Sequence, residues 1–132
     1  MQTADLAKTW ALVAGAILVL VGILGFFPNP IVGSAAGALV ATDTLHNIVH
    51  LGTGVLALVI YSLSSGGARK TALIGFGVLY AAVFVLVLVS PSLFGLFAVP
   101  ANAIDHVIHA ALAAVTLGVA FMARGSYEPV RA

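Results

Sequence analysis

The chain has 132 residues, of which 62% are hydrophobic and only 7% are charged, whereas a soluble domain averages about 25% charged residues. The formal net charge of +1 and the lack of any basic cluster exclude the electrostatic footprint of a nucleic-acid-binding protein. Because the chain has no cysteine, it cannot form a disulfide, a thiolate metal site or a Cys-ligated iron–sulfur cluster.

Four apolar runs are long enough to cross a membrane. They cover residues 9–27, 43–64, 70–90 and 102–123, and each approaches or exceeds the roughly 20 residues that a hydrocarbon core requires. The connections, FPNPIVGSAAGALVAT, SSGGARK and SPSLFGLFAVPA, are rich in Pro, Gly and Ser, which favours turns. We therefore predict an all-α, four-transmembrane-helix, up-down-up-down bundle that forms a single membrane domain over residues 1–132.

The first run could instead be read as a cleaved signal peptide. Lys8 precedes it, and the later GSAAGA stretch offers small residues. However, the run is longer than the usual apolar region of about 7–15 residues, and GFFPNP follows it in place of a cleavage site. We expect the run at 9–27 to be retained as a membrane span.

The basic residues predict the orientation. In a four-span chain all five fall on one side, and the 28–42 and 91–101 connections contain none; the five are Lys8, Arg69, Lys70, Arg124 and Arg131. The positive-inside rule then predicts a multi-pass protein of the cell's inner membrane with both termini in the cytoplasm. The expected partner is the lipid bilayer. The sequence leaves two alternatives for protein partners, a homo-oligomer or a larger membrane complex.

An internal repeat divides the chain into halves of about 1–66 and 67–132. The stretch DTLHNIVHLG at 43–52 is similar to NAIDHVIHAA at 102–111, and these two stretches hold all four histidines. The repeat predicts two tandem helical hairpins in the same orientation, related by a pseudo-two-fold axis along the membrane normal. The second and fourth spans then face each other.

Both repeated stretches open with a helix-start signal. Asp43 is the predicted N-cap of the second span, and Asn102 is the predicted N-cap of the fourth, with Asp105 at the third helical position. At about 100° per residue, the histidines of each span share a stripe with polar and small residues. Such a stripe is expected to face protein, because lipid offers polar side chains no partner.

The histidine spacing permits a metal site. His46 and His50 are spaced i, i+4, and His106 and His109 are spaced i, i+3, so each pair lies on one helix face. Four neutral imidazoles would suit Zn, Cu, Ni or Fe. Asp43, Asn47 and Asp105 are close enough in sequence to be ligands themselves or to orient the histidine rings by hydrogen bonds. Asn102 is expected to orient the rings as well.

A second interpretation uses only the repeat-equivalent pair. His50 and His109 would be the two axial ligands of a b-type haem, with Gly54 and Ala113 one turn further leaving room for the macrocycle. His46 and His106 would then need another role.

Two interpretations need no cofactor. The His, Asp and Asn side chains would form interhelical hydrogen bonds in a structural or accessory membrane subunit, or they would line a small proton or ion pathway. Enzyme activity is not favoured, because the chain has no nucleophile elbow, no phosphate-binding glycine motif and too few histidines for a membrane di-iron enzyme. We therefore assign no catalytic residue.

Three segments resemble a known family. GILGFFP at 22–28, HNIVHLGTG at 46–54 and DHVIH at 105–109 are similar to the pattern of a widespread bacterial family of small four-helix integral membrane proteins of unknown function. The resemblance implies the four-helix architecture and supplies no activity. The apolar loop between Pro28 and Asp43 is expected to lie on the membrane surface or over the histidine cluster.

Overall fold

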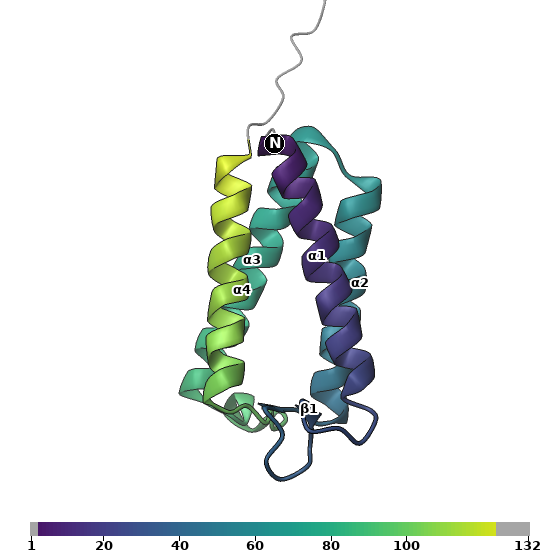
Figure 1. Ribbon diagram of the computed structural model, residues 1–132. Helices are drawn as coiled ribbons and strands as arrows, with labels where there is room; N and C mark the ends of the chain where they lie inside the picture. Colours follow the sequence, from purple (N-terminus) through teal and green to yellow (C-terminus); the bar gives the residue numbers. More distant parts are fainter. Residues whose placement is uncertain (1–2, 124–132) are drawn as a thin grey trace, which may run out of the picture.

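The computed structural model is a bundle of four long helices that run up, down, up and down (Figure 1). It describes residues 3–123, and the helices are α1 (Thr3–Leu24), α2 (Thr44–Leu63), α3 (Gly66–Val89) and α4 (Ala103–Met122). Each is long and apolar enough to cross a membrane. The predicted all-α fold is confirmed, and the chain is a multi-pass membrane protein.

Two helices begin at the predicted capping residues. The carboxylate of Asp43 accepts a hydrogen bond of 2.8 Å from the backbone N–H of His46, at the start of α2. The side-chain oxygen of Asn102 accepts one of 3.0 Å from the backbone N–H of Asp105, at the start of α4. These bonds satisfy donors that a helix N-terminus leaves unpaired. By contrast, α1 and α3 begin before the apolar runs, because a helix can continue into the polar interface.

The four helices associate as two hairpins. α1 packs along α2 and α3 packs along α4, and contacts between the hairpins are much sparser. The hairpins come together near the end that holds the N-terminus, where α1 and α3 cross (Figure 1). We call this the N-terminal end. The core there combines small, aliphatic and aromatic buried side chains, among them Ala7, Ala11, Leu73, Phe76 and Ala120.

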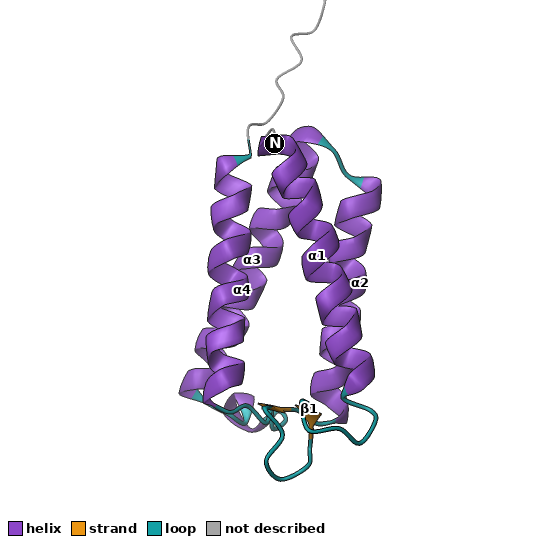
Figure 2. Ribbon diagram, viewed as in Figure 1, coloured by secondary structure: helices purple, strands orange, loops and turns teal. Residues whose placement is uncertain are grey.

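The opposite end carries two longer connections, and we call it the loop end. The first contains two short parallel strands, β1 (Val32–Gly33) and β2 (Val40–Ala41), which the sequence did not reveal (Figure 2). The second contains a single 3₁₀ turn at Leu93–Gly95. The side-chain amide of Asn102 donates a hydrogen bond of 2.9 Å to the carbonyl of Leu39, so the first connection is tied to the start of α4.

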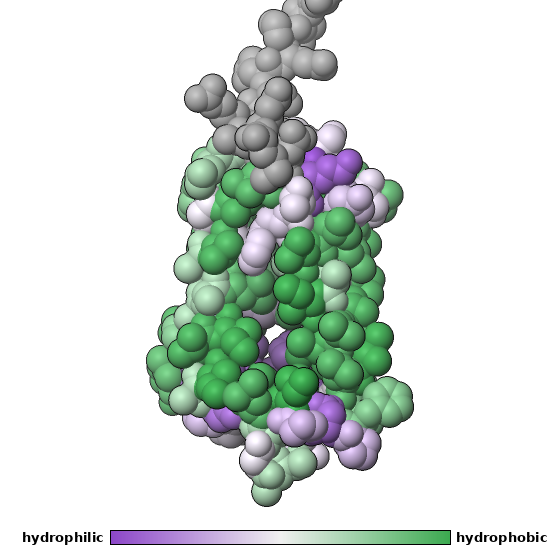
Figure 3. All heavy atoms as spheres, in the orientation of Figure 1, coloured by the Kyte–Doolittle hydropathy of each residue, from purple (hydrophilic) through white to green (hydrophobic). Residues whose placement is uncertain are grey.

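The surface shows the pattern expected of a membrane protein. On the face shown in Figure 3, apolar side chains cover the middle of the molecule and hydrophilic residues gather near its two ends. Lys8, Arg69 and Lys70 lie at the N-terminal end, near the start of α1 and the start of α3. Arg124 and Arg131 lie outside the described residues. The three described cations therefore share one end, as the orientation prediction requires.

Glycine permits the close packing of α1 on α2. A Cβ added at Gly54 would lie 2.7 Å from the backbone nitrogen of Val19 and 3.0 Å from the carbonyl oxygen of Gly15. Backbone atoms cannot yield as a flexible side chain can, so a larger residue must push the helices apart. Gly52 lies two residues earlier, where a Cβ would meet nothing within 4 Å in the part of the chain that the structure describes.

The orientation can be tested by cysteine labelling of this cysteine-free chain. Ser34 is exposed at the loop end and Ser65 is exposed at the N-terminal end. Ser65→Cys should react with a membrane-impermeant maleimide only after cell lysis, and Ser34→Cys should react in intact cells with a permeable outer envelope. Labelling of both from the same side would contradict the four-span topology.

Gly54→Leu should destabilise the first hairpin, because it forces side-chain atoms against the backbone of α1. We expect a loss of about 1–3 kcal/mol in the free energy of unfolding, the usual cost of overpacking. Gly52→Leu is the matched control on the same helix and should stay within about 0.5 kcal/mol of wild type. Equal losses in the two variants, measured by denaturation in detergent micelles, would refute the packing role of Gly54.

Candidate metal centre

Three of the four histidines meet a carboxylate between the two hairpins. His46 and His50 come from α2, and Asp105 and His109 come from α4. All four residues are buried, and Asp105 has no exposed surface at all. One ligand atom from each of the four can be chosen such that all lie within 4.8 Å of one another. The cluster therefore contains groups that bind metal ions, from both halves of the bundle.

The helix starts fix the position of this cluster. Because Asp43 and Asn102 cap α2 and α4, the cluster begins within the first turn of each helix. His46 and His50 are spaced i, i+4, and so are Asp105 and His109, so each pair forms one helix face. The two faces meet at the loop end, where the hairpins are further apart than at the N-terminal end (Figure 1).

The closest approaches inside the cluster join potential ligand atoms. The Nε2 atoms of His50 and His109 are 3.4 Å apart. Nε2 of His109 lies 3.6 Å from Oδ1 of Asp105, and Nε2 of His46 lies 3.9 Å from Oδ2 of Asp105. These separations are longer than the roughly 2.7–3.2 Å of a good hydrogen bond. The groups converge without pairing closely with one another.

A backbone carbonyl fixes the tautomer of His46. Nδ1 of its ring lies 3.0 Å from the carbonyl oxygen of Pro100, in the connection between α3 and α4. A carbonyl oxygen only accepts, so Nδ1 carries the proton. In the neutral ring Nε2 then has a free lone pair. This lone pair belongs to the nitrogen nearest the carboxylate of Asp105.

Several buried polar atoms of the cluster have no hydrogen-bond partner among the described residues. They include both carboxylate oxygens of Asp105 and the Nδ1 atoms of His50 and His109. Buried polar atoms are normally paired, and an unpaired buried carboxylate is especially costly. This concentration of unpaired polar atoms distinguishes the cluster from an ordinary interhelical hydrogen-bond network.

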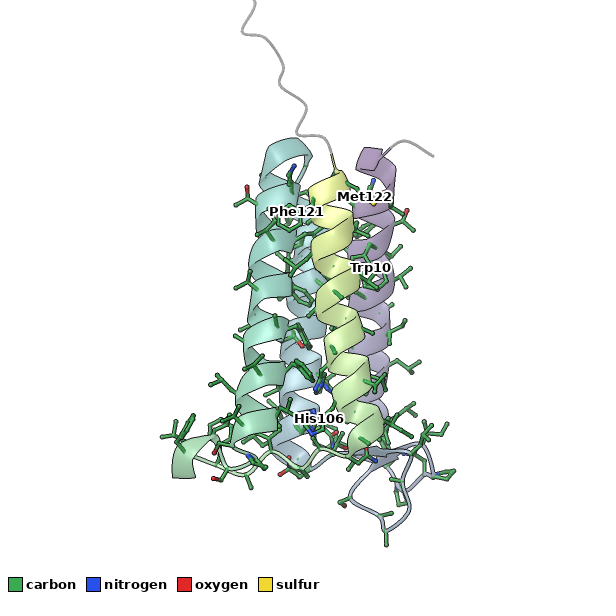
Figure 4. All side chains as sticks on the ribbon, turned by 90° about the vertical axis from the view of Figure 1, so that its left-hand side faces the viewer. Trp10, His106, Phe121 and Met122 are labelled. Atoms are coloured by element: carbon green, nitrogen blue, oxygen red, sulfur yellow. The ribbon has the colours of Figure 1, made fainter. Side chains whose placement is uncertain are left out.

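The other residues singled out from the sequence lie elsewhere. His106 is on α4 near the loop end (Figure 4), half-buried, with its ring centroid 6.3 Å from that of Phe84, and it is not a member of the four-residue group. Asp43 and Asn102 act as helix caps. Asn47 is buried where α1 ends, and a Cβ at Gly25 would clash with its amide.

The structure places Asp105 and His106 differently. The sequence predicted His106 as a ligand and Asp105 as either a ligand or a partner that orients the rings, and the structure groups Asp105 with the three other histidines. The i, i+4 spacing of Asp105 and His109 was the available signal. It equals the spacing of His46 and His50 in the other half.

Two apolar cavities flank the cluster, and the rings of His50 and His109 line both. One, of about 190 Å³, lies between α2 and α3 beneath the 93–99 segment. The other, of about 260 Å³, lies between α1 and α4. Hydrophilic side chains are visible through an opening in the apolar surface between the hairpins (Figure 3).

Comparison with known proteins identifies a family and no activity. No curated protein and no solved structure matches the chain. The resemblance to a family of unknown function is confirmed by a family model described as "Domain of unknown function (DUF4383)", which matches residues 8–122, and the chain belongs to this family.

Proposed function

We propose that this protein binds a transition metal ion between its two membrane-embedded hairpins, through His46, His50, Asp105 and His109. The observation that carries the proposal is the arrangement of His46 and Asp105. The Pro100 carbonyl leaves the neutral His46 ring with a lone pair on Nε2, 3.9 Å from a buried carboxylate that has no partner among the described residues. Two electron-rich groups held together in an apolar environment call for a cation.

The distances support a four-coordinate ion. Metal–ligand bonds of about 2.0–2.1 Å in a tetrahedron place neighbouring ligand atoms about 3.3–3.4 Å apart. Three ligand-atom pairs of the cluster lie at 3.4, 3.6 and 3.9 Å, so only small side-chain movements would complete the geometry. Three imidazoles and one carboxylate suit Zn²⁺ and also Fe²⁺, Co²⁺ or Ni²⁺, and one carboxylate offsets half of the charge of the ion.

The geometry favours this ion over haem. Axial imidazoles on opposite faces of one iron need their Nε2 atoms about 4 Å apart, at roughly 2 Å each, with a flat macrocycle between them. The Nε2 atoms of His50 and His109 are only 3.4 Å apart. Asp105 lies 3.6 Å from Nε2 of His109, where an anionic carboxylate would meet the macrocycle.

The geometry also disfavours a cluster held only by hydrogen bonds. Such a cluster should pair each ring and carboxylate at about 2.7–3.2 Å. Only the contact between His46 and Pro100 meets this criterion among the described members of the cluster. The same distances disfavour a proton pathway, because such a pathway needs donors and acceptors within hydrogen-bonding distance of one another.

The proposed role is structural rather than catalytic. A metal site with four protein ligands leaves no open coordination position for a substrate, as is typical of structural sites. The ligands come in equal numbers from hairpins that touch each other sparsely, so the ion would join them at the loop end. We further propose that the protein lies in the inner membrane with its N-terminal end in the cytoplasm, which is supported by Lys8, Arg69 and Lys70.

Ligand variants should separate members of the cluster from neighbours. His109→Ala and Asp105→Asn should lower metal affinity by at least about 10–100-fold, the loss caused even by removing an outer-shell partner. His106→Ala is the matched control on the same helix and should keep the wild-type metal content, because His106 lies outside the group. The metal content of the purified protein is measured by mass spectrometry. Wild-type protein that holds no metal after incubation with added metal ions would refute the proposal.

Metal removal should loosen the contact between the hairpins. At a free metal concentration 100 times Kd, binding stabilises the folded state by about 2.7 kcal/mol, so a chelator should lower the Tm of the wild-type protein. The Tm of Asp105→Asn should respond little to the same chelator. If the chelator lowers both Tm values equally, its effect does not arise from this site.

A further inference from the structure

The larger of the two cavities is a groove along the seam between α1 and α4, and we call it the α1–α4 groove. Its lining extends from Trp10 to Val21 on α1 and from Asp105 to Val115 on α4. Eleven helical steps on α1, at about 1.5 Å each, make the groove about 16 Å long. The hydrocarbon core of a bilayer is about 30 Å thick, so each leaflet contributes about half of it. The groove therefore matches the depth that the acyl chains of one leaflet cover.

The groove opens to lipid along the side of the bundle. Three of its lining side chains are also exposed on the apolar surface, namely Ile17, Ile108 and Val115. Figure 3 shows an opening on this face, between α4 on the left and α1 on the right. Because the protein spans the membrane, this surface faces acyl chains, which can enter the groove without crossing a polar layer.

The accessible lining of the groove is almost wholly apolar. The carboxylate oxygens of Asp105 and the Nδ1 atoms of His50 and His109 lie at its inner wall, but they have almost no accessible surface. The indole N–H of Trp10 donates a hydrogen bond of 2.9 Å to the hydroxyl of Thr116 and is therefore occupied. A water molecule needs about two to four polar partners, and a polar ligand would leave its own groups unpaired here. The groove therefore selects a ligand that is hydrocarbon throughout.

The width of the groove suits a single chain. A volume of about 260 Å³ over a length of about 16 Å leaves a cross-section of roughly 16 Å², which is about 4 Å across. Nonbonded carbon atoms approach to about 3.5–4.0 Å, so one file of methylene groups fits, whereas a second helix of about 10–12 Å diameter does not. An empty groove would lose these van der Waals contacts, and the bilayer supplies chains at high concentration.

We infer that the α1–α4 groove binds one acyl chain of a membrane phospholipid, which lies lengthwise between the two hairpins. The chain fills the space that the sparse contacts between α1 and α4 leave open. It also covers the metal cluster on this side, because His50, Asp105 and His109 line the groove. Binding of the chain does not require the proposed metal ion, since the chain uses no ligand atom.

The single tryptophan of the protein reports on the groove, because Trp10 lies at its N-terminal end. The full-length protein is placed in nanodiscs, one copy per disc, made of phosphatidylcholine whose acyl chains are dibrominated. Bromine quenches indole fluorescence on contact. Ala14→Leu fills the groove one turn from Trp10, so quenching relative to unbrominated nanodiscs should fall by about half. Trp10 is half-buried, and bulk lipid accounts for the remaining quenching.

Ala16→Leu is the matched control on the same helix. Ala16 is exposed and does not line the groove, so quenching in this variant should stay within about 10% of wild type. Equal quenching in the two variants would show that Trp10 contacts only bulk lipid, and this outcome would overturn the inference.

Native mass spectrometry of the protein ejected from these nanodiscs identifies the occupant by its mass. Wild type and Ala16→Leu should retain one brominated phospholipid more than Ala14→Leu does. Equal numbers of retained phospholipids in wild type and Ala14→Leu, or a compound of another mass lost only from Ala14→Leu, would overturn the inference. If Ala14→Leu does not fold, Ala111→Leu at the mouth of the groove replaces it. None of these substitutions changes a proposed metal ligand, so the metal content of each sample tests the metal proposal separately.

Discussion

The buried carboxylate of Asp105 is the constraint on which the loop half of the bundle depends. A carboxylate with no exposed surface and no hydrogen-bond partner among the described residues is unfavourable in an apolar interior. Its nearest polar neighbours are imidazole nitrogens of His46 and His109. The fixed tautomer of His46 leaves a lone pair on Nε2, the ring nitrogen nearest this carboxylate. These unpaired groups, contributed by both hairpins, are the observations on which the proposed metal site rests.

The two hairpins pack differently at the two ends of the bundle. At the N-terminal end, small residues such as Ala11 and Ala120 let the hairpins approach, and the indole of Trp10 donates to the hydroxyl of Thr116 at 2.9 Å. Van der Waals packing of this kind is what associates helices in lipid, where the hydrophobic effect contributes little. At the loop end the helices leave cavities on both sides of the polar cluster, so the hairpins pack less closely there.

The sequence predicted what depends on local physics. Apolar run length identified four spans, Asp43 and Asn102 marked the starts of α2 and α4, and the stripe pattern brought His46, His50 and His109 to the interior. The choice between Asp105 and His106 could not be made this way. At about 100° per residue, they lie about 40° and 60° to opposite sides of His109, so a modest rotation of α4 selects one or the other. Packing between hairpins sets that rotation, and periodicity within one helix carries no information about it.

The connection between α3 and α4 contributes both to the cluster and to the cavity between α2 and α3. Its Pro100 carbonyl fixes the tautomer of His46, and its Leu93 and Phe97 help to line the cavity. Leu93 and Phe94 adopt positive φ angles of 46° and 58°, a conformation that costs about 1–3 kcal/mol for residues other than glycine. Such strain persists only where surrounding contacts over-determine the backbone. The same segment therefore both orients the ring of His46 and closes one end of the cavity beside the cluster.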